Sequence, residues 1–285
     1  MMRRRRFLTL SAAALATPVM GAAPLRWHGI ALGANASFEL QGPAEITRSA
    51  LAAALNAIRR IEALFSLYDP ASALSRLNAT GRLDRPDAAM LDLFRAAHRV
   101  HDLTKGRFDP TVQTIWPEGQ NRAAIGWSRV RYNATRIALH DGQSLTFNGI
   151  AQGFATDRAA DALRVAGLTD IHVNVGEQRT HGPARQLGVE DPVHGLVGNI
   201  TLRNSAVATS SPLATPAGAQ GHILSPFGEV PQWSTVTVMA DSATLADGLS
   251  TGLCHAPFDT VATVRTTPGV KAILLVDPAG DVRRL

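Results

Sequence analysis

The order of helical and strand-like patterns constrains the fold of this chain more strongly than any other feature of its sequence. Apolar residues recur at helical spacing over residues 44–65 and 87–104, and a further helix is predicted over residues 150–166. Short β-like runs are predicted at residues 136–140, 144–147, 170–175, 234–240 and 271–277. Because strands and helices do not alternate strictly, the pattern favours an α+β fold over a doubly wound parallel sheet.

The first 22 residues are typical of an export signal rather than of a folded segment. They begin with clustered arginines, continue as a run of small apolar residues and end near an A-x-A-like site. Residues 4–8, RRRFL, fit the R-R-x-F-L pattern of a twin-arginine signal, the bacterial route for folded proteins. An ordinary Sec signal with an arginine-rich start is the alternative. We therefore expect a signal over residues 1–22, a single domain over residues 23–285 and a periplasmic location.

Removal of this signal changes the charge of the chain. The mature part has 24 basic and 23 acidic residues and is nearly neutral. No basic stripe remains to argue for a nucleic-acid partner, and no other apolar stretch reaches the roughly 18 residues that a membrane span needs. Cys254 is the only cysteine, so no internal disulfide can form.

The segment DSATLADGLSTG, residues 241–252, places an acid and a hydroxyl residue, Asp247 and Thr251, four positions apart. On a helix these side chains would lie on the same face and could converge on one ligand. Carboxylate and hydroxyl oxygens are the hard donors that magnesium or calcium prefers. The alternative is that Asp247 bonds a neighbouring backbone amide and Thr251 bonds back within its own helix.

The segment LTFNGIAQGFATDRAADAL, residues 145–163, predicts a strand, a turn at Asn148 and Gly149, and a helix with Gly153 near its start. Backbone amides at a helix N-terminus attract anions, so a glycine there would let a phosphate approach closely. Helix packing is the alternative reason for a glycine at this place.

Three further loops carry candidate site residues. Asn174 and Gly176 lie where a predicted strand ends, a common place for a ligand-facing loop. Asp109 and Thr111 flank a proline after a helix end, where an Asx-type turn is the alternative. His222 lies beside a glycine and before a turn, and it is the histidine most suited to a site.

These segments, in this order, resemble the ApbE family of bacterial FAD:protein FMN transferases. The motifs are LGANASFEL, FSLYDPASALSRLN, GRFDPT, NGIAQGFATDRAADAL, HVNVG, AVATSS, GHILSPFGEVP and TVTVMADSATLADGLST. The resemblance spans nearly all of the mature chain and implies a T-fold-like α+β architecture with antiparallel sheets packed against helices. It also implies binding of FAD and Mg²⁺, and transfer of FMN to a threonine or serine hydroxyl of an acceptor protein with release of AMP.

The resemblance implies roles for individual residues. Asp247 and Thr251 match magnesium ligands, together with backbone oxygen of Gly149 and Ala151, and Asp247 is thereby matched to catalysis. His222 matches the group that orients or deprotonates the attacking hydroxyl. The residues matched to nucleotide binding are Tyr68 on the adenine side, Phe108, Asp109, Thr111, Thr146, Gly149, Gln152, Gly153, Asn174, Gly176 and Ile223.

Four positions depart from the family pattern. Thr146 stands where the family usually has Asp, Gln152 where it has Lys or Glu, and Glu177 where it has a second Gly. After His222 the family typically reads I-D-P-x-T-G, whereas this chain reads ILSPFG, with Ser225 in the motif and no acid in it. Three activities therefore remain open: flavin transfer, FAD carriage or assembly without efficient transfer, and FAD hydrolysis to FMN and AMP.

The expected partners follow from the same resemblance. They are FAD as substrate and an exported or membrane-bound redox protein with a target threonine or serine. An inner-membrane redox complex is one place where such an acceptor could occur. The sequence leaves the identity of the acceptor and the oligomeric state open.

Overall fold

The computed structural model describes residues 23–116, 121–214 and 221–285, and the predicted signal over residues 1–22 lies outside them. The helices in the described residues are α1 (Ala44–Phe65), α2 (Ala73–Thr80), α3 (Ala88–Leu103), α4 (Ala151–Val165), α5 (Ala243–Leu253) and α6 (Phe258–Arg265), with 3₁₀ turns η1 (Pro110–Ile115), η2 (Arg122–Ala124) and η3 (Trp127–Arg129).

The strands form one large sheet and two small ones. They are β1 (Leu25–Ala31), β2 (Ala34–Gln41), β3 (Arg82–Asp84), β4 (Arg131–Tyr132), β5 (Arg136–Ala138), β6 (Asp170–Val175), β7 (Gln178–His181), β8 (Arg185–Asp191), β9 (Gly195–Leu202), β10 (Ala206–Ser210), β11 (Thr235–Ala240), β12 (Val270–Val276) and β13 (Val282–Arg284). The large sheet has the order β1-β2-β6-β7-β10-β11-β12-β13, and the small ones are β3-β5-β4 and β8-β9. Every pairing is antiparallel, which confirms the predicted α+β class.

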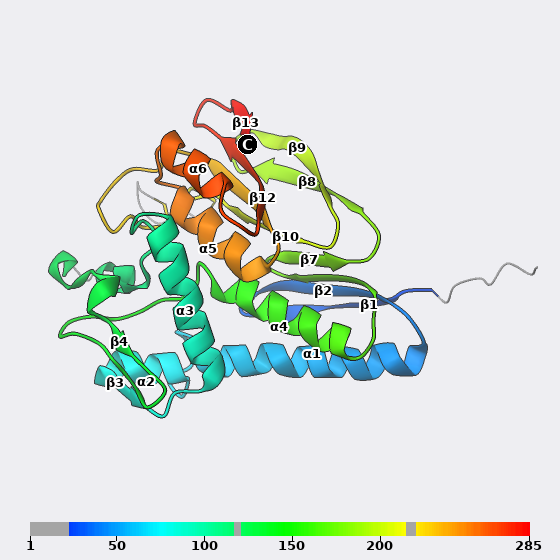
Figure 1. The fold of residues 1–285 in the computed structure, drawn as a ribbon, viewed down its shortest axis with the longest axis horizontal. Helices are drawn as coiled ribbons and strands as arrows, with labels where there is room; N and C mark the ends of the chain where they lie inside the picture. Colours follow the sequence, from blue (N-terminus) through cyan, green and yellow to red (C-terminus); the bar gives the residue numbers. More distant parts are fainter. Residues whose placement is uncertain (1–22, 117–120, 215–220) are drawn as a thin grey trace, which may run out of the picture.

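The large sheet buries one face against helices. Along β6, Ile171, Val173 and Val175 are buried and alternate with half-exposed residues, as the two-residue period of a strand requires. Helix α4 contacts β6, and α5 contacts β10 and β11, while α1 packs on the outer side of α4. The layers seen in Figure 1 are therefore the sheet, then α4 and α5, then α1 and α3 on the outside.

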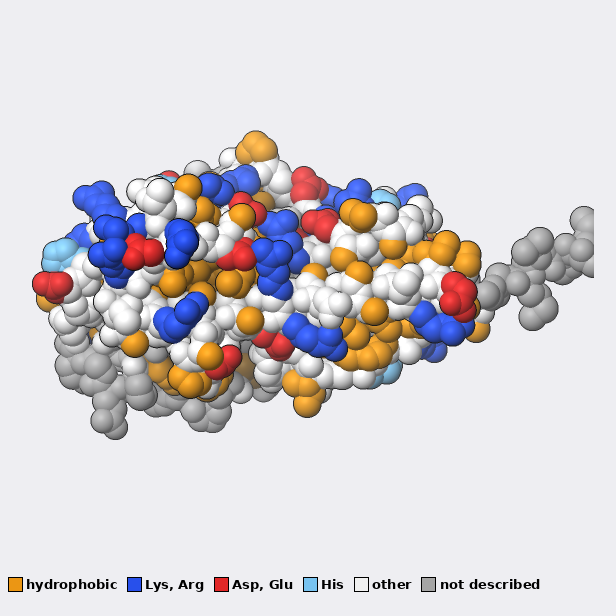
Figure 2. All heavy atoms as spheres, turned by 90° about the horizontal axis from the view of Figure 1, so that it is seen from below, with side chains coloured by type: hydrophobic (Ala, Val, Ile, Leu, Met, Phe, Trp, Pro, Cys, Tyr) orange, Lys and Arg blue, Asp and Glu red, His pale blue; other side chains and the backbone are white. Residues whose placement is uncertain are grey.

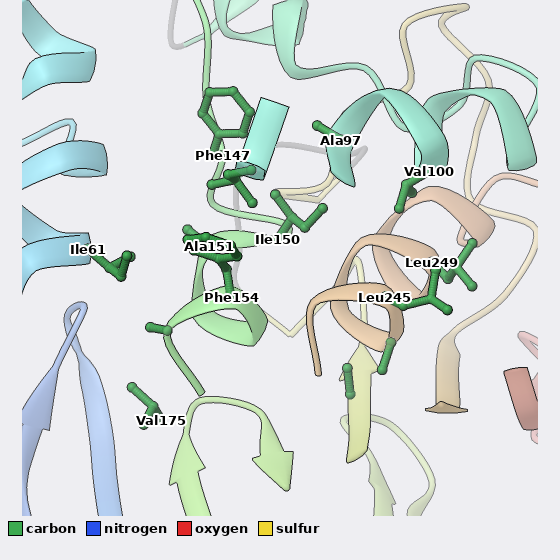
Figure 3. Packing of buried hydrophobic residues seen from close by; sticks show 14 of the residues in the cluster. Ile61, Ala97, Val100, Phe147, Ile150, Ala151, Phe154, Val175, Leu245 and Leu249 are labelled. Atoms are coloured by element: carbon green, nitrogen blue, oxygen red, sulfur yellow. The ribbon is translucent and has the colours of Figure 1, made fainter. Parts of the chain in front are cut away.

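The start of α4 lies in the core between α1 and α5. In Figure 3, Ile150 and Phe154 lie between Ile61 of α1 on one side and Leu245 and Leu249 of α5 on the other. All five side chains are nearly or fully buried. Because interiors are close-packed, this contact fixes how the first turn of α4 lies against α5.

The three predicted helices are confirmed as α1, α3 and α4, with ends within one residue of the expected ones. The Asp87 side chain caps α3 by accepting a hydrogen bond from the Ala89 N–H at 2.8 Å. Beyond the other end of α3, Gly106 has φ of +82°, the left-handed conformation in which glycine commonly ends a helix.

The predicted strand at residues 144–147 is wrong, because this segment pairs with no strand. Its alternation is real, since Leu145 and Phe147 are buried. The Asn78 side chain accepts from the Leu145 N–H at 2.8 Å and donates to the Leu145 carbonyl at 2.9 Å. The Thr146 N–H donates to the Pro110 carbonyl at 2.9 Å. A side chain and a turn therefore satisfy backbone groups that a strand neighbour would otherwise bind.

Basic and acidic side chains are interspersed on the face seen from below the view of Figure 1 (Figure 2). Apolar side chains form separate areas between the charged ones on this face. Within the described residues, no helix has both the length and the apolar character to cross a bilayer.

Candidate functional site

A cleft of about 620 Å³ opens between the loop that precedes α4, the 3₁₀ turn η1, the end of β10 and helix α5. Ten predicted site residues line it: Tyr68, Phe108, Asp109, Thr146, Gly149, Gln152, His222, Ile223, Asp247 and Thr251. Five others lie outside its lining: Thr111, Ala151, Gly153, Asn174 and Gly176. The structure thus brings together side chains that are up to 183 positions apart in the chain, from Tyr68 to Thr251.

Helix α5 presents Asp247 and Thr251 on the face that lines the cleft. Asp247 is 3% exposed. One of its oxygens accepts the Gly153 N–H at 2.8 Å, so the expected bond to a backbone amide exists, but it comes from another helix. The Thr251 hydroxyl lies 3.3 Å from Ser210 Oγ. The pair can therefore offer one carboxylate and one hydroxyl to the same ligand.

The N-terminus of α5 is held by an acid from α4. Asp157 accepts hydrogen bonds from the Ala243 and Thr244 N–H groups at 2.9 Å each, and from the Thr244 hydroxyl at 2.6 Å. The same carboxylate pairs with Arg179 of β7. Because Asp157 joins two helices and a strand, it sets the position from which α5 delivers Asp247 into the cleft.

The two glycines at the start of α4 have different surroundings. A Cβ at Gly149 would lie 2.9 Å from Thr251 Oγ1, so only glycine lets the turn approach this hydroxyl so closely. A Cβ at Gly153 would lie 2.3 Å from the Ala243 carbonyl oxygen. Gly153 also gives its N–H to Asp247 and lies outside the cleft lining. Gly153 is therefore a helix-packing residue, which was the alternative for it. Gly149, in contrast, faces the cleft.

A second carboxylate, Glu177, lines the cleft beside Asp247 and is 9% exposed. Burial raises the pKa of Asp247 to about 7; the Gly153 N–H opposes this rise and repulsion by Asp157 adds to it. Burial and repulsion by Asp247 raise the pKa of Glu177, while a hydrogen bond from the Thr209 backbone opposes the rise. The two acids thus form a desolvated pair with like charge.

Asp109 and Thr111 form the Asx-type turn that was the alternative at this place. Asp109 Oδ1 accepts from the Thr111 N–H at 2.8 Å and from the Thr111 hydroxyl at 2.6 Å. Its other oxygen accepts the Trp127 N–H at 3.1 Å. Thr111 in turn accepts the Gly126 N–H at 2.8 Å. Asp109 still lines the cleft, but its carboxylate is engaged in holding η1 and the loop to Trp127.

The turn after β6 supports the cleft from behind. Asn174 Oδ1 accepts the Gly176 N–H at 3.1 Å, and Gly176 has φ of +93°. A Cβ at Gly176 would lie 2.7 Å from Gln152 Cδ. Gly176 therefore lets the chain turn directly behind Gln152, which itself lines the cleft. Ala151 is buried at the first position of α4.

The other end of the cleft is open. Tyr68 is 92% exposed and follows α1, where Ser66 Oγ accepts the Tyr68 N–H at 3.1 Å. His222 is exposed, and its N–H donates to the Pro212 carbonyl at 3.1 Å. Ile223 is half-buried between them and the core. Loops rather than helices carry these side chains.

The loop that follows His222 carries an acid at a position that the motif did not predict. Glu229 accepts from Ser225 Oγ at 3.2 Å and from Arg107 Nη2 at 2.8 Å. Arg107 lines the cleft and lies over the Phe227 ring at 5.8 Å. A negative charge is therefore present beside Ser225, in the motif that lacks the family's acid.

Three acids in or around the site, Asp157, Glu177 and Glu229, had no assigned role in the sequence analysis, and of these Glu177 lines the cleft. Asp157 lies in the quoted motif at residues 145–163, but its partners are 86 and 87 positions away, and no local pattern reveals them. Glu177 was visible as a departure from the family pattern, which was the only signal that could have drawn attention to it.

Solved structures of ApbE proteins have this architecture. The ApbE protein of Thermotoga maritima aligns with a TM-score of 0.82 at 25% identity, over 92% of this chain and 96% of that chain. The apo form of the flavinyl transferase ApbE of Pseudomonas stutzeri aligns with a TM-score of 0.79 at 21% identity, over 94% and 97%. The curated FAD:protein FMN transferase of Haemophilus influenzae is 24% identical, with 69% of each chain covered.

The antiparallel sheet, its helical layer and the cleft between them therefore have the fold of the solved ApbE structures. The ApbE family model matches residues 32–274, which is most of the chain. This protein belongs to the ApbE family.

Proposed function

We propose that this protein is a magnesium-dependent FAD:protein FMN transferase. It attaches FMN from FAD to a threonine or serine hydroxyl of an exported or membrane redox protein and releases AMP. The observation that carries the proposal is the meeting of Asp247, Thr251 and the turn at Gly149 in one cleft. Membership of the ApbE family supports it, as does the activity named for the H. influenzae relative.

The buried end of the cleft fits Mg²⁺. The Asp247 carboxylate, the Thr251 hydroxyl and backbone oxygen at Gly149 and Ala151 would hold it, and all are hard oxygen donors. The described residues contain no group of three or more acidic, histidine or cysteine side chains arranged for a metal. A magnesium ion suits such a sparse set, because it usually takes one or two carboxylates and shares the phosphates of the substrate. When bound, it would neutralise charge on the pyrophosphate oxygens.

The side chains of the protein contribute binding and proton transfer. Tyr68 and Trp116 offer aromatic surface for a ring of FAD in the lining of the cleft. His222 is the group that would accept the proton of the acceptor hydroxyl. The hydroxyl oxygen then forms a new bond to the phosphorus of FMN, and the pyrophosphate bond to the AMP leaving group breaks.

Flavin transfer is favoured over simple FAD carriage because the loop after His222 still carries an acid. The carboxylate of Glu229 is bonded to Ser225 and paired with Arg107, which lines the cleft. The motif after His222 lacks the family's acid, but Glu229 supplies an acid in the same loop. This arrangement would keep the loop after His222 ordered beside the cleft.

The test is an assay with the purified protein, FAD, Mg²⁺ and a periplasmic flavoprotein domain that has a candidate acceptor threonine. An FMN-sized gain in the intact mass of the acceptor, with AMP formed, is expected. FAD that stays bound and unchanged would contradict transfer in favour of carriage. AMP without labelling of the acceptor, in this and other acceptor domains, would identify hydrolysis instead.

We also propose that residues 1–22 direct export to the periplasm by the twin-arginine route. Replacement of Arg4 and Arg5 by lysine is expected to leave the chain in the cytoplasm, which fractionation of the producing cells measures. Unchanged export of this variant would favour the Sec route.

A further inference from the structure

The backbone of Glu177 is held by hydrogen bonds, whereas its carboxylate has few hydrogen-bond donors around it. Its carbonyl accepts from the Val175 N–H at 3.0 Å and from the Thr156 hydroxyl at 3.1 Å. Its side chain is more than nine-tenths buried and lines the cleft with Asp247. The carboxylate accepts one hydrogen bond, from the Thr209 backbone.

Other buried acids in the described residues accept several hydrogen bonds at their carboxylates. Asp191 accepts from the hydroxyls of Ser234 and Thr235 at 2.6 and 2.7 Å, and from the N–H groups of Val193 and His194 at 2.8 and 2.9 Å. These donors hold the pKa of Asp191 below its usual range despite burial. A structural acid in this fold therefore collects several donors.

Asp109 and Asp157 follow the same rule. Asp109 accepts from Thr111 and Trp127, and Asp157 caps α5 and pairs with Arg179. Each thus has more than one partner that stabilises its charge.

Glu177 and Asp247 differ from these acids. Both line the same cleft, Asp247 accepts one backbone N–H, from Gly153, and neither acid is ion-paired with Lys, Arg or His within the described part of the chain. Buried charges are normally paired or coordinate a metal. Both carboxylates line a cleft that is open to ions from solvent. The missing partner is therefore a cation.

We propose that Glu177 is a second carboxylate at the cation site, and that it allows the protein to bind a divalent cation before the dinucleotide arrives. The proposal rests on the proposed function, which places Mg²⁺ at Asp247 and Thr251. With Asp247 alone, a magnesium ion depends largely on substrate phosphates for its charge balance. With Glu177 added, two carboxylates line the nucleotide-free cleft, and a dication that displaces their protons is balanced by both.

The experiment measures cation binding to the nucleotide-free protein rather than turnover. Isothermal titration calorimetry with MgCl₂, and electron paramagnetic resonance with Mn²⁺, are applied to the full chain and to Glu177→Gln, which keeps shape and removes charge. We expect the substitution to weaken binding by roughly tenfold or more, as is typical even for residues that only support a ligand. The matched control is Glu190→Gln, because Glu190 is an exposed glutamate on β8. Its binding should equal that of the unaltered protein.

Stability in chelator separates a ligand from a structural residue. Without metal, Glu177→Gln relieves repulsion at Asp247, so its melting temperature should equal or exceed that of the unaltered protein, while the rise on adding Mg²⁺ should shrink. A variant that melts lower in chelator and keeps the full rise with Mg²⁺ would overturn the proposal. Equal cation affinity in both proteins would overturn it too.

A third series, with FAD present, distinguishes this inference from the proposed function. Cation binding that requires FAD, equally in both proteins, would refute the role of Glu177 and leave a magnesium-dependent transferase. Absence of cation binding even with FAD would refute the magnesium site as a whole.

Discussion

The two ends of the cleft differ in how firmly the fold holds their side chains. At the buried end, Asp247 is 3% exposed and is delivered by a helix whose N-terminus Asp157 caps. At the open end, Tyr68 is 92% exposed and His222 lies in a loop. Rigid elements can hold desolvated charge in place, whereas exposed loops can adapt to a partner. We infer that phosphate and metal chemistry belong to the buried end, and recognition of rings and of the acceptor to the open end.

The largest expected effect tests the buried end directly. Asp247→Asn should lower the rate of acceptor flavinylation by roughly 10³-fold, about 4 kcal/mol, because it removes the charge that holds Mg²⁺ at the phosphates. The measurement is the initial rate of labelling by intact mass. Asp281→Asn, at an exposed site on the β12–β13 turn, is the control and should retain the full rate. Equal rates for the two variants would contradict the role of Asp247 in holding Mg²⁺.

The next effect concerns how the buried end is held. Asp157→Ala should lower the free energy of unfolding by about 3 kcal/mol, because it removes the acceptor of the Ala243 and Thr244 N–H groups at the start of α5 and leaves Arg179 without its buried partner. Denaturant titration measures this. Asp161→Ala is the matched control, because Asp161 lies one turn further along α4 and is about half exposed, 3.8 Å from Arg179. It should cost less than about 0.5 kcal/mol. Similar losses in both variants would contradict the capping role.

Asp247 should make its own contribution to the pH dependence of stability, opposite in sign to that of His172 and His255, whose pKa values are lowered by burial. The pKa of Asp247 is about 7 in the folded protein but about 3.9 in an unfolded chain, so the folded state holds the extra proton between these values. The contribution of Asp247 to stability in chelator, taken as the difference between the unaltered protein and Asp247→Asn, should therefore fall by about 2 kcal/mol between pH 5 and pH 7. Denaturant titrations of both proteins across this range measure the difference. A difference that does not change with pH would assign the dependence to other groups.

The smallest effect belongs to the open end. Tyr68→Ala should raise the KM for FAD by about three- to tenfold through lost aromatic contact, while kcat and the free energy of unfolding change little. Steady-state kinetics with varied FAD separate the two constants. Tyr68→Phe keeps the ring and should behave like the unaltered protein. A loss of kcat as large as that of Asp247→Asn would contradict the assignment of ring recognition to the open end and of phosphate chemistry to the buried end.

Helices were predictable from the sequence where local signals agreed. In α3, the apolar period, the Asp87 cap and the Gly106 stop all point to the same ends. The strand at residues 144–147 failed because alternation reports burial of every second side chain, and not the partner of the backbone. Here that partner is Asn78, which lies 67 positions earlier.

Site residues follow the same division. The spacing of Asp247 and Thr251 sufficed to predict a shared helix face, and the structure has both lining one cleft. The same local reasoning offered two roles for Gly153 and could not choose between them. The choice depends on Ala243, which packs against Gly153 from another helix.

By itself, the sequence determined the fold class, the main helices, the Asp247–Thr251 pair and the family resemblance, because each depends on residues a few positions apart or on motifs in order. Only the tertiary structure decided that Asp157 caps α5, that Glu229 stands beside Ser225, and that Glu177 faces Asp247. These contacts depend on how the sheet and helices pack, which no local pattern encodes. Burial then sets the charge state of the acids, because desolvation is a property of the folded surroundings rather than of the residue.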